Sequence, residues 1–146
     1  MLRLLMVLAL SANAWGISSG WETDFAKAKA RANTEQKLIL LNFSGSDWCI
    51  PCIRLKKEVF NDSLFLQYAD EHLLLVNADF PRSKKNQLPK GLEDQNNQLA
   101  EHFNPKGSFP LTILMDANEK ILKVWEGNPD LSPETFINQI KAYDSH

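Results

Sequence analysis

The two cysteines of this 146-residue chain, Cys49 and Cys52, lie three positions apart. At the start of a helix, this spacing puts both side chains on one face and within reach of a disulfide. The N–H groups of the first turn lack partners inside the helix, and together with the helix dipole they favour a thiolate at Cys49. Cys52 lies one turn deeper and is less ionised. The spacing therefore predicts a redox-active disulfide in which Cys49 attacks and Cys52 resolves.

Two other uses of a cysteine pair are less favoured. A bridge that closes so small a loop removes little entropy from the unfolded chain, so it would stabilise the fold little. A zinc site needs two further ligands, and the histidines that could supply them, His72, His102 and His146, are far apart in the sequence. The sequence therefore favours thiol–disulfide chemistry, with no metal and no cofactor.

The segments around the cysteine pair alternate between strand and helix patterns. Continuous apolar runs of strand length are typical of strands covered on both faces, and they occupy residues 37–43, 73–79 and 111–115, with a partner strand at 121–125. Helical patterns occupy residues 21–33, 49–60, 63–71, 92–103 and 133–143. This order predicts an α/β fold: a central mixed sheet flanked by helices, preceded by a leading N-terminal helix.

The motif Trp48-Cys49-Ile50-Pro51-Cys52, directly after a predicted buried strand, resembles the active-site region of the thioredoxin superfamily. The longer run from Phe43 to Cys49 is similar to an exported bacterial branch, the thioredoxin-like reductases related to the periplasmic disulfide-bond (Dsb-type) enzymes. The resemblance covers about residues 21–143. It implies a thioredoxin fold for this part of the chain.

The resemblance also implies roles for residues beside the cysteines. Pro110, about sixty residues after the pair, matches a proline that is cis in the family and packs against the cysteines. The backbone of Phe109 would then pair with the substrate chain as an added strand. Trp48 would shield the cysteines. Together with Ile50 and Pro51, these residues are the predicted substrate-binding surface.

The sequence departs from thioredoxin where that family carries a buried acid and a lysine. The matching positions are interpreted as Asn42 and Leu75. An amide takes no proton at working pH, so the general base that helps to deprotonate the resolving cysteine is missing. Asp47, Glu58 or water could replace it, and Asp47 could equally be a helix cap.

The segment 80–91 is a predicted loop that carries several basic side chains. These are Arg82, Lys84, Lys85 and Lys90. A solvated loop is the favoured interpretation, and a docking surface for an acidic partner is the alternative.

The residues between the cysteines bear on the direction of the reaction. Ile50 and Pro51 offer no side-chain donor to stabilise a thiolate at Cys49, so the reduced form should give up electrons readily. We therefore expect a monomeric reductase of protein disulfides, recharged by a membrane or soluble thiol electron donor. An isomerase or oxidase of the same fold is the alternative, as is a chaperone or metal-binding module without enzymatic activity.

The first residues are typical of a signal peptide. Arg3 precedes the apolar run Leu4 to Leu10, and Ala12-Asn13-Ala14 fits a small-x-small cleavage site. We predict a signal peptide at 1–14 and a thioredoxin-like domain at 15–146, exported to the periplasm and soluble after cleavage. The formal net charge of −2 gives no electrostatic reason to bind nucleic acid.

Overall fold

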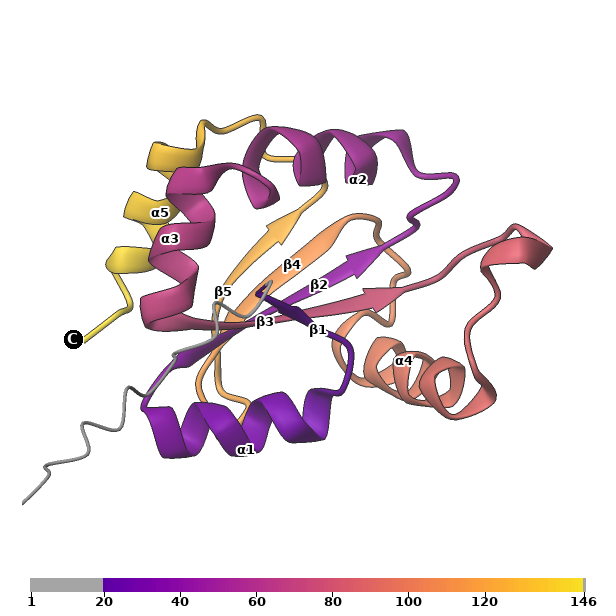
Figure 1. Cartoon of the computed structure of the whole chain (residues 1–146), viewed down its shortest axis with the longest axis horizontal. Coiled ribbons are helices and arrows are strands. Elements are labelled where there is room, and N and C mark those ends of the chain that lie inside the picture. Colours follow the sequence, from indigo (N-terminus) through magenta and orange to yellow (C-terminus); the bar gives the residue numbers. More distant parts are fainter. Residues whose placement is uncertain (1–19, 146) are drawn as a thin grey trace, which may run out of the picture.

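A five-stranded mixed sheet crosses the domain in the order β1-β3-β2-β4-β5 (Figure 1). The computed structural model describes residues 20–145, so the predicted signal peptide lies outside the described residues. β1 and β2 pair with β3 in parallel, and β4 runs antiparallel to β2 and β5. The strands are β1 (Trp21–Glu22), β2 (Leu38–Ser44), β3 (Leu73–Asp79), β4 (Leu111–Met115) and β5 (Ile121–Glu126).

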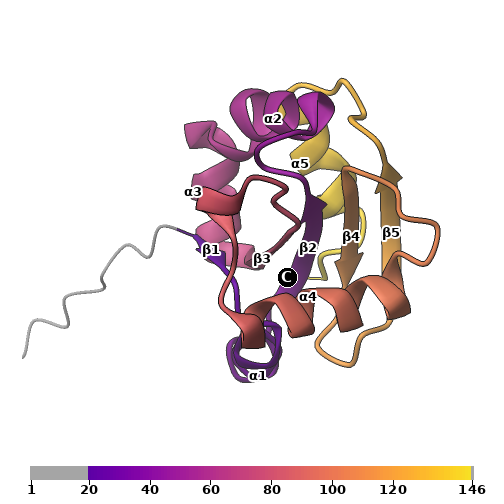
Figure 2. The same cartoon turned by 90° about the vertical axis from the view of Figure 1, so that its right-hand side faces the viewer.

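Helices cover both faces of this sheet. α1 and α4 pack on one face, whereas α2, α3 and α5 pack on the other (Figures 1 and 2). The helices are α1 (Phe25–Glu35), α2 (Ile50–Leu55), α3 (Ser63–His72), α4 (Lys90–Phe103) and α5 (Pro133–Lys141), with a π-helix η1 (Lys56–Phe60) and a 3-10 turn η2 (Lys84–Asn86). Each face thus encloses its own apolar core.

The alternation of side chains along β2 determines what faces the active-site helix. Ile39, Leu41 and Phe43 belong to the core beneath α1 and α4, and Leu40 belongs to the core beneath α2. Because successive side chains of a strand point to opposite faces, Asn42 points to the α2 side. A polar residue is thereby placed under the helix that carries the cysteines.

The helix predicted over residues 21–33 is wrong at its start. Trp21 and Glu22 form β1, which pairs with the outer edge of β3. An open edge leaves backbone N–H and C=O groups unpaired, and β1 provides partners for part of that edge. α1 begins after Asp24, whose carboxylate caps the helix by accepting the Lys27 N–H at 2.9 Å.

The helix predicted over residues 49–60 consists of two pieces. α2 ends at Leu55, and η1 follows with a wider turn in which the Asn61 N–H donates to the carbonyl of Lys56, five residues back, at 2.8 Å. In an α-helix, the side chains of two residues five positions apart point in different directions. The wider turn of the π-helix places Phe60 on the buried face beside Val59, so both side chains enter the core.

The remaining elements agree closely with the predictions. β3 and β4 have the predicted bounds, and α4 begins two residues earlier than predicted, which shortens the preceding loop. Ser132 caps α5 by accepting the Thr135 N–H at 3.1 Å. Within residues 20–145, no helix has the length and apolar character needed to span a membrane.

Candidate active site

Cys49 and Cys52 form a disulfide at the N-terminus of α2. Their Cα atoms are 5.3 Å apart and their sulfurs are bonded. Cys49 is the N-cap of the helix, in extended conformation, and its sulfur accepts the N–H of Cys52 at 3.3 Å. Pro51 lies in the first turn, where its lack of an N–H leaves no intrahelical bond unmade. In the reduced protein, the Cys52 N–H is therefore placed to stabilise a thiolate at Cys49.

The disulfide is shielded, and the residue after Cys49 is not. Cys49 and Cys52 are only 4% and 3% exposed, whereas Ile50 is 66% exposed. Pro51 is exposed as well. A substrate can reach the sulfurs only along the surface formed by the residues packed around them.

Trp48, directly before Cys49, is partly buried and makes several specific contacts. Its indole N–H donates to the carbonyl of Phe80 at 2.7 Å, and its ring meets Phe109 edge-on with 5.4 Å between ring centroids. The Arg82 guanidinium carbon lies 3.7 Å from the ring centroid. Gly45 also lies against the indole ring, and a Cβ atom added at this glycine would overlap it. The glycine is therefore required for the close approach of Trp48.

Phe109 lies against Trp48, and Pro110 follows it at the start of β4. The Phe109–Pro110 peptide bond is cis. Phe109 is half-buried between Trp48 and Phe80, each ring 5.4 Å away. Pro110 is buried, and its carbonyl accepts the Gly127 N–H at 2.8 Å. Three aromatic rings from three separate segments thus form one wall of the site.

Asp47 binds the loop that follows β3. Its carboxylate accepts the backbone N–H groups of Arg82 and Ser83, each at 2.9 Å, and the Asn86 side-chain amide at 3.0 Å. These hydrogen bonds, the one from Arg82 foremost, hold the pKa of Asp47 below its ordinary value. The interpretation of Asp47 as a helix cap is wrong, because Cys49 is the N-cap and both Asp47 oxygens bind the loop.

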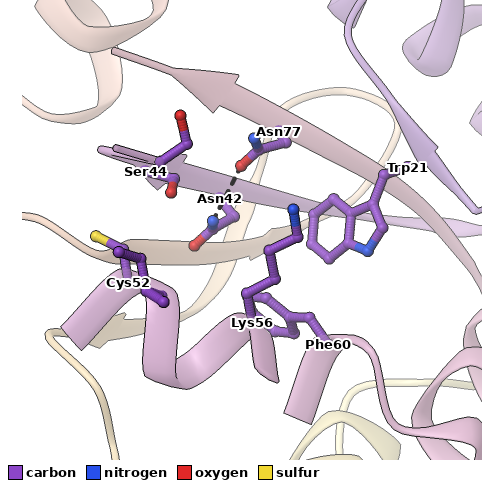
Figure 3. Close-up of a pocket in the computed structure, with 9 residues that line it drawn as sticks. Trp21, Asn42, Ser44, Cys52, Lys56, Phe60 and Asn77 are labelled. Atoms are coloured by element: carbon purple, nitrogen blue, oxygen red, sulfur yellow. Dashed lines mark hydrogen bonds between the residues drawn. The ribbon is translucent and has the colours of Figure 1, made fainter. Parts of the chain in front are cut away.

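A cavity of about 280 Å³ lies on the other side of the motif, behind Cys52 (Figure 3). Its lining consists of Trp21, Asn42, Ser44, Ser46, Cys52, Ile53, Lys56, Phe60 and Asn77. None of these carries a carboxylate. Glu58, considered as a replacement base, pairs with Arg54 at 3.4 Å and does not line the cavity.

Two asparagines form the polar wall of this cavity. The Asn42 amide donates to the Asn77 side-chain oxygen at 3.1 Å and accepts the Thr112 hydroxyl at 3.0 Å. In the register of β2 and β3, Asn42 pairs with Asn77, and Leu75, interpreted as the match to the family's lysine, pairs with Leu40. Figure 3 shows the Lys56 side chain extending into the same space, towards Trp21.

His72 and His102 contact other parts of the fold, and His146 lies outside the described residues. His72 stacks on Tyr68, with ring centroids 4.4 Å apart, and its Nδ1 lies 2.7 Å from the Asp144 carboxylate. His102 meets the ring of its neighbour Phe103 edge-on. No group of three or more potential metal ligands is found in residues 20–145.

Residues 20–117 match the thioredoxin-like family. This chain belongs to that family. It is 35% identical over 122 residues to the disulfide bond reductase DsbH of Chlamydia pneumoniae, covering 84% of this chain and 70% of that protein. It is 25% identical over 100 residues to the thioredoxin-related protein DsbJ of the same organism, covering 68% of this chain but 28% of that protein.

Solved structures agree on the fold. The DsbH oxidoreductase superposes with a TM-score of 0.75 at 30% identity, covering 84% of this chain and 81% of the other. A thioredoxin from Thermus thermophilus superposes with a TM-score of 0.62 at 12% identity, covering 84% and 85%. The predicted thioredoxin fold is confirmed. With its paired cysteines at the start of α2, this member of the family is a thiol–disulfide oxidoreductase.

Sequence reasoning missed several residues of the site. Asn77 lies more than 20 positions from the motif, and no local pattern connects it to the cysteines. Arg82 was named as a cation of the loop, but nothing in the sequence placed it against Trp48. Gly45 carried a usable signal, since a glycine just before an active-site tryptophan can mark a close approach. Lys56 also carried one, because residues four apart share a helix face and it follows Cys52 by four.

Proposed function

We propose that this chain reduces protein disulfides, with Cys49 as the nucleophile and Cys52 as the resolving thiol. The observation that carries the proposal is the hydrogen bond from the Cys52 N–H to the Cys49 sulfur at the start of a helix. It favours the thiolate at Cys49 while Ile50 and Pro51 add no side-chain donor. The similarity to a disulfide bond reductase supports the same direction.

The exchange proceeds in two steps. The Cys49 thiolate attacks one sulfur of the substrate disulfide, and the other sulfur leaves as a thiolate that takes a proton from solvent. Cys52 then loses its proton and attacks the Cys49 sulfur, which breaks the mixed disulfide. The substrate has gained two electrons as a dithiol, and the protein is left with the Cys49–Cys52 disulfide seen here. A thiol donor, in a membrane or in solution, must restore the dithiol.

The substrate chain binds beside the aromatic wall. Trp48 and Phe109 supply fixed apolar surface, and the exposed Ile50 contacts the chain next to the attacked disulfide. Pro51, exposed between the cysteines, belongs to the same proposed surface, and the buried Pro110 sets the position of Phe109. Backbone pairing of the substrate with Phe109 makes recognition tolerant of sequence.

The place of action follows from the proposed signal peptide. Cleavage after Ala14 releases a monomeric domain, residues 15–146, into the periplasm, where the compartment is oxidising and a reductase needs its own donor. Amino-terminal sequencing of the protein from its native host tests this: the mature chain should begin at Trp15. Recovery of intact Met1 on cytoplasmic protein would overturn it.

The redox potential of the Cys49–Cys52 couple tests the direction. Each 30 mV corresponds to about 1.4 kcal/mol for a two-electron couple, and one or two charge-assisted hydrogen bonds absent at Cys49 shift the potential by tens of millivolts. Equilibration with glutathione should give a value near that of thioredoxin, roughly −270 mV. A value above about −150 mV, with rapid oxidation of a reduced substrate, would make the protein an oxidase.

A further inference from the structure

The loop between β3 and α4, residues 80–89, is part of the active-site surface. In Figure 2 this loop lies between α2 and α4 in front of the sheet. Each of the three residues before Cys49 bonds to this loop or to the strand end that leads into it. Ser46 bonds to the Asp79 carboxylate through its N–H at 2.9 Å and its hydroxyl at 2.5 Å, and Asp47 and Trp48 make the bonds given above. The loop and the motif therefore form one packed unit.

Within that unit, the carboxylates face inward. The Asp47 oxygens accept donors of the loop, and the Asp79 oxygens accept donors of Ser46 and Phe80, the Phe80 N–H at 3.0 Å. Within residues 20–145 neither carboxylate forms an ion pair with a cation of the loop.

The cations of the loop face outward without such partners. Arg82, Lys84 and Lys85 are exposed, and within residues 20–145 none of them forms an ion pair. Lys90, by contrast, pairs with Asp94. Three cations against two inward carboxylates leave this face positive, on a chain whose formal net charge is −2.

Arg82 is the cation nearest to the chemistry. Its guanidinium lies over the ring of Trp48, the residue before Cys49. Its backbone N–H is held by Asp47, so both ends of the residue are fixed relative to the motif. A guanidinium fixed in this way loses less freedom on binding a carboxylate than an unrestrained side chain does.

We propose that Arg82, assisted by Lys84 and Lys85, selects substrates that carry Asp or Glu beside the cysteine attacked by Cys49. The proposal rests on the proposed reductase function. A substrate strand that pairs with Phe109 runs past the edge of Trp48, because the two rings are in contact. Acidic side chains on that strand meet the Arg82 fork, which binds carboxylates with two parallel hydrogen bonds. The two lysines attract the acidic segment before contact.

Two peptide disulfides test this selection. They are identical except that the cysteine is flanked by two Glu residues in one and two Lys residues in the other. Exposed ion pairs contribute about 0.2–1 kcal/mol each, so at low ionic strength kcat/KM for the Glu peptide should exceed that for the Lys peptide by roughly 3- to 10-fold. The ratio should fall towards one at about 0.5 M salt, where the charges are screened.

Variants assign the effect to residues. Arg82→Gln should lower the Glu/Lys ratio about threefold. Arg82→Lys keeps the charge but loses the fork, so its ratio should lie between those of Arg82→Gln and the unchanged protein. A double variant, Lys84→Gln with Lys85→Gln, should lower the ratio without touching Trp48. Lys120→Gln is the matched control: Lys120 is exposed, and its turn after β4 lies at the end of the sheet opposite the cysteines. Its ratio should equal that of the unchanged protein.

The outcomes separate the two proposals. Equal reduction of both peptides at low ionic strength overturns the selection and leaves the reductase function standing. A preference that Arg82→Gln leaves unchanged overturns the role of Arg82. Failure to reduce either peptide, or the disulfides of insulin, overturns the reductase function itself.

Discussion

The two flanks of the cysteine motif are built in opposite ways. On the Cys49 flank, Trp48 is enclosed by Phe109, Arg82 and the Gly45 backbone, and the preceding residues are hydrogen-bonded to a neighbouring loop. On the Cys52 flank lies a cavity of about 280 Å³ with amide walls, several times the roughly 30 Å³ share of a water molecule. The attacking sulfur therefore has a rigid recognition surface, and the resolving thiol faces space that can admit solvent.

This difference separates recognition from proton transfer. A packed flank fixes the substrate in one geometry, which favours fast attack. The open flank provides no carboxylate to take the Cys52 proton, so the proton must leave by way of the cavity. The following changes test each flank, from the largest expected effect to the smallest.

Replacing the cysteines should give the largest and most asymmetric effect. Cys49→Ser removes the nucleophile and should lower reductase activity on the order of 10³-fold or more. Cys52→Ser leaves attack intact but not resolution, so mixed disulfides with substrate should accumulate on non-reducing gels. Alkylation of the reduced protein at neutral pH should label Cys49 faster than Cys52. If Cys49→Ser accumulates mixed disulfides and Cys52→Ser does not, Cys52 is the nucleophile and Cys49 the resolving thiol.

Gly45→Ala should disrupt the packed flank. The new methyl group would overlap the indole of Trp48, so the ring must leave its present position against Phe80 and Phe109. A displacement of this kind beside reacting atoms should lower kcat/KM on the order of tenfold, with a change in tryptophan fluorescence.

Gly91→Ala is the matched control for that change. A Cβ at Gly91 meets nothing within 4 Å, and the residue lies in the first turn of α4. This variant should keep full activity and should be as stable or up to about 1 kcal/mol more stable, since alanine favours the helix. Equal activity of the two variants would show that the close approach of Trp48 has no role in the reaction.

Asn42→Asp should alter the open flank. Burial raises the pKa of a carboxyl, so the new group would titrate close to neutral pH and could accept the Cys52 proton. We expect resolution of the mixed disulfide to become about 2- to 5-fold faster near pH 7, with a loss of stability of about 1–3 kcal/mol from the disturbed amide network.

Thr112→Val controls for the loss of the hydrogen bond. It removes the donor to the Asn42 oxygen without supplying a base. Stopped-flow measurement of the second exchange step should show no acceleration in this variant. If the second exchange step is no faster in Asn42→Asp than in Thr112→Val, removal of the Cys52 proton does not limit the reaction.

Asp47→Asn should have the smallest effect, seen mainly in acid. The folded-state pKa of Asp47 lies below its ordinary value of 3.8, through the N–H bonds from the loop. Its stabilising contribution is therefore complete above pH 3.8 and is lost as the pH falls through the lower folded-state value. The unchanged protein should lose the Trp48 environment only as the pH falls below 3.8, and Asp47→Asn should show a flatter acid limb with about twofold lower neutral activity.

Tryptophan fluorescence and activity against pH measure this effect. Asp116→Asn is the control, because Asp116 accepts N–H groups in the turn at the far end of the sheet. Its acid limb should match that of the unchanged protein. The same acid limb for Asp47→Asn and the unchanged protein would show that the loop is held by other contacts.

The sequence alone was sufficient for features that rest on local patterns. β3 and β4 are nearly continuous apolar runs, which are typical of strands covered on both faces, so their bounds were predictable. The spacing of Cys49 and Cys52, with Pro51 in the first turn, placed the motif at a helix start for reasons internal to the helix. Ser132 and Pro133 defined the start of α5 in the same way.

Tertiary structure decided what depends on partners distant in the chain. Trp21 and Glu22 became a strand because β3 presented an open edge, which no neighbouring residue could reveal. The pairing of Asn42 with Asn77 followed from the register of β2 and β3, which no pattern local to either strand specifies. Arg82 contacts Trp48 because Asp47 accepts hydrogen bonds from the loop that carries Arg82 and so holds that loop against the motif. Side-chain type limits what a residue can bind, but only the folded chain brings its partner within reach.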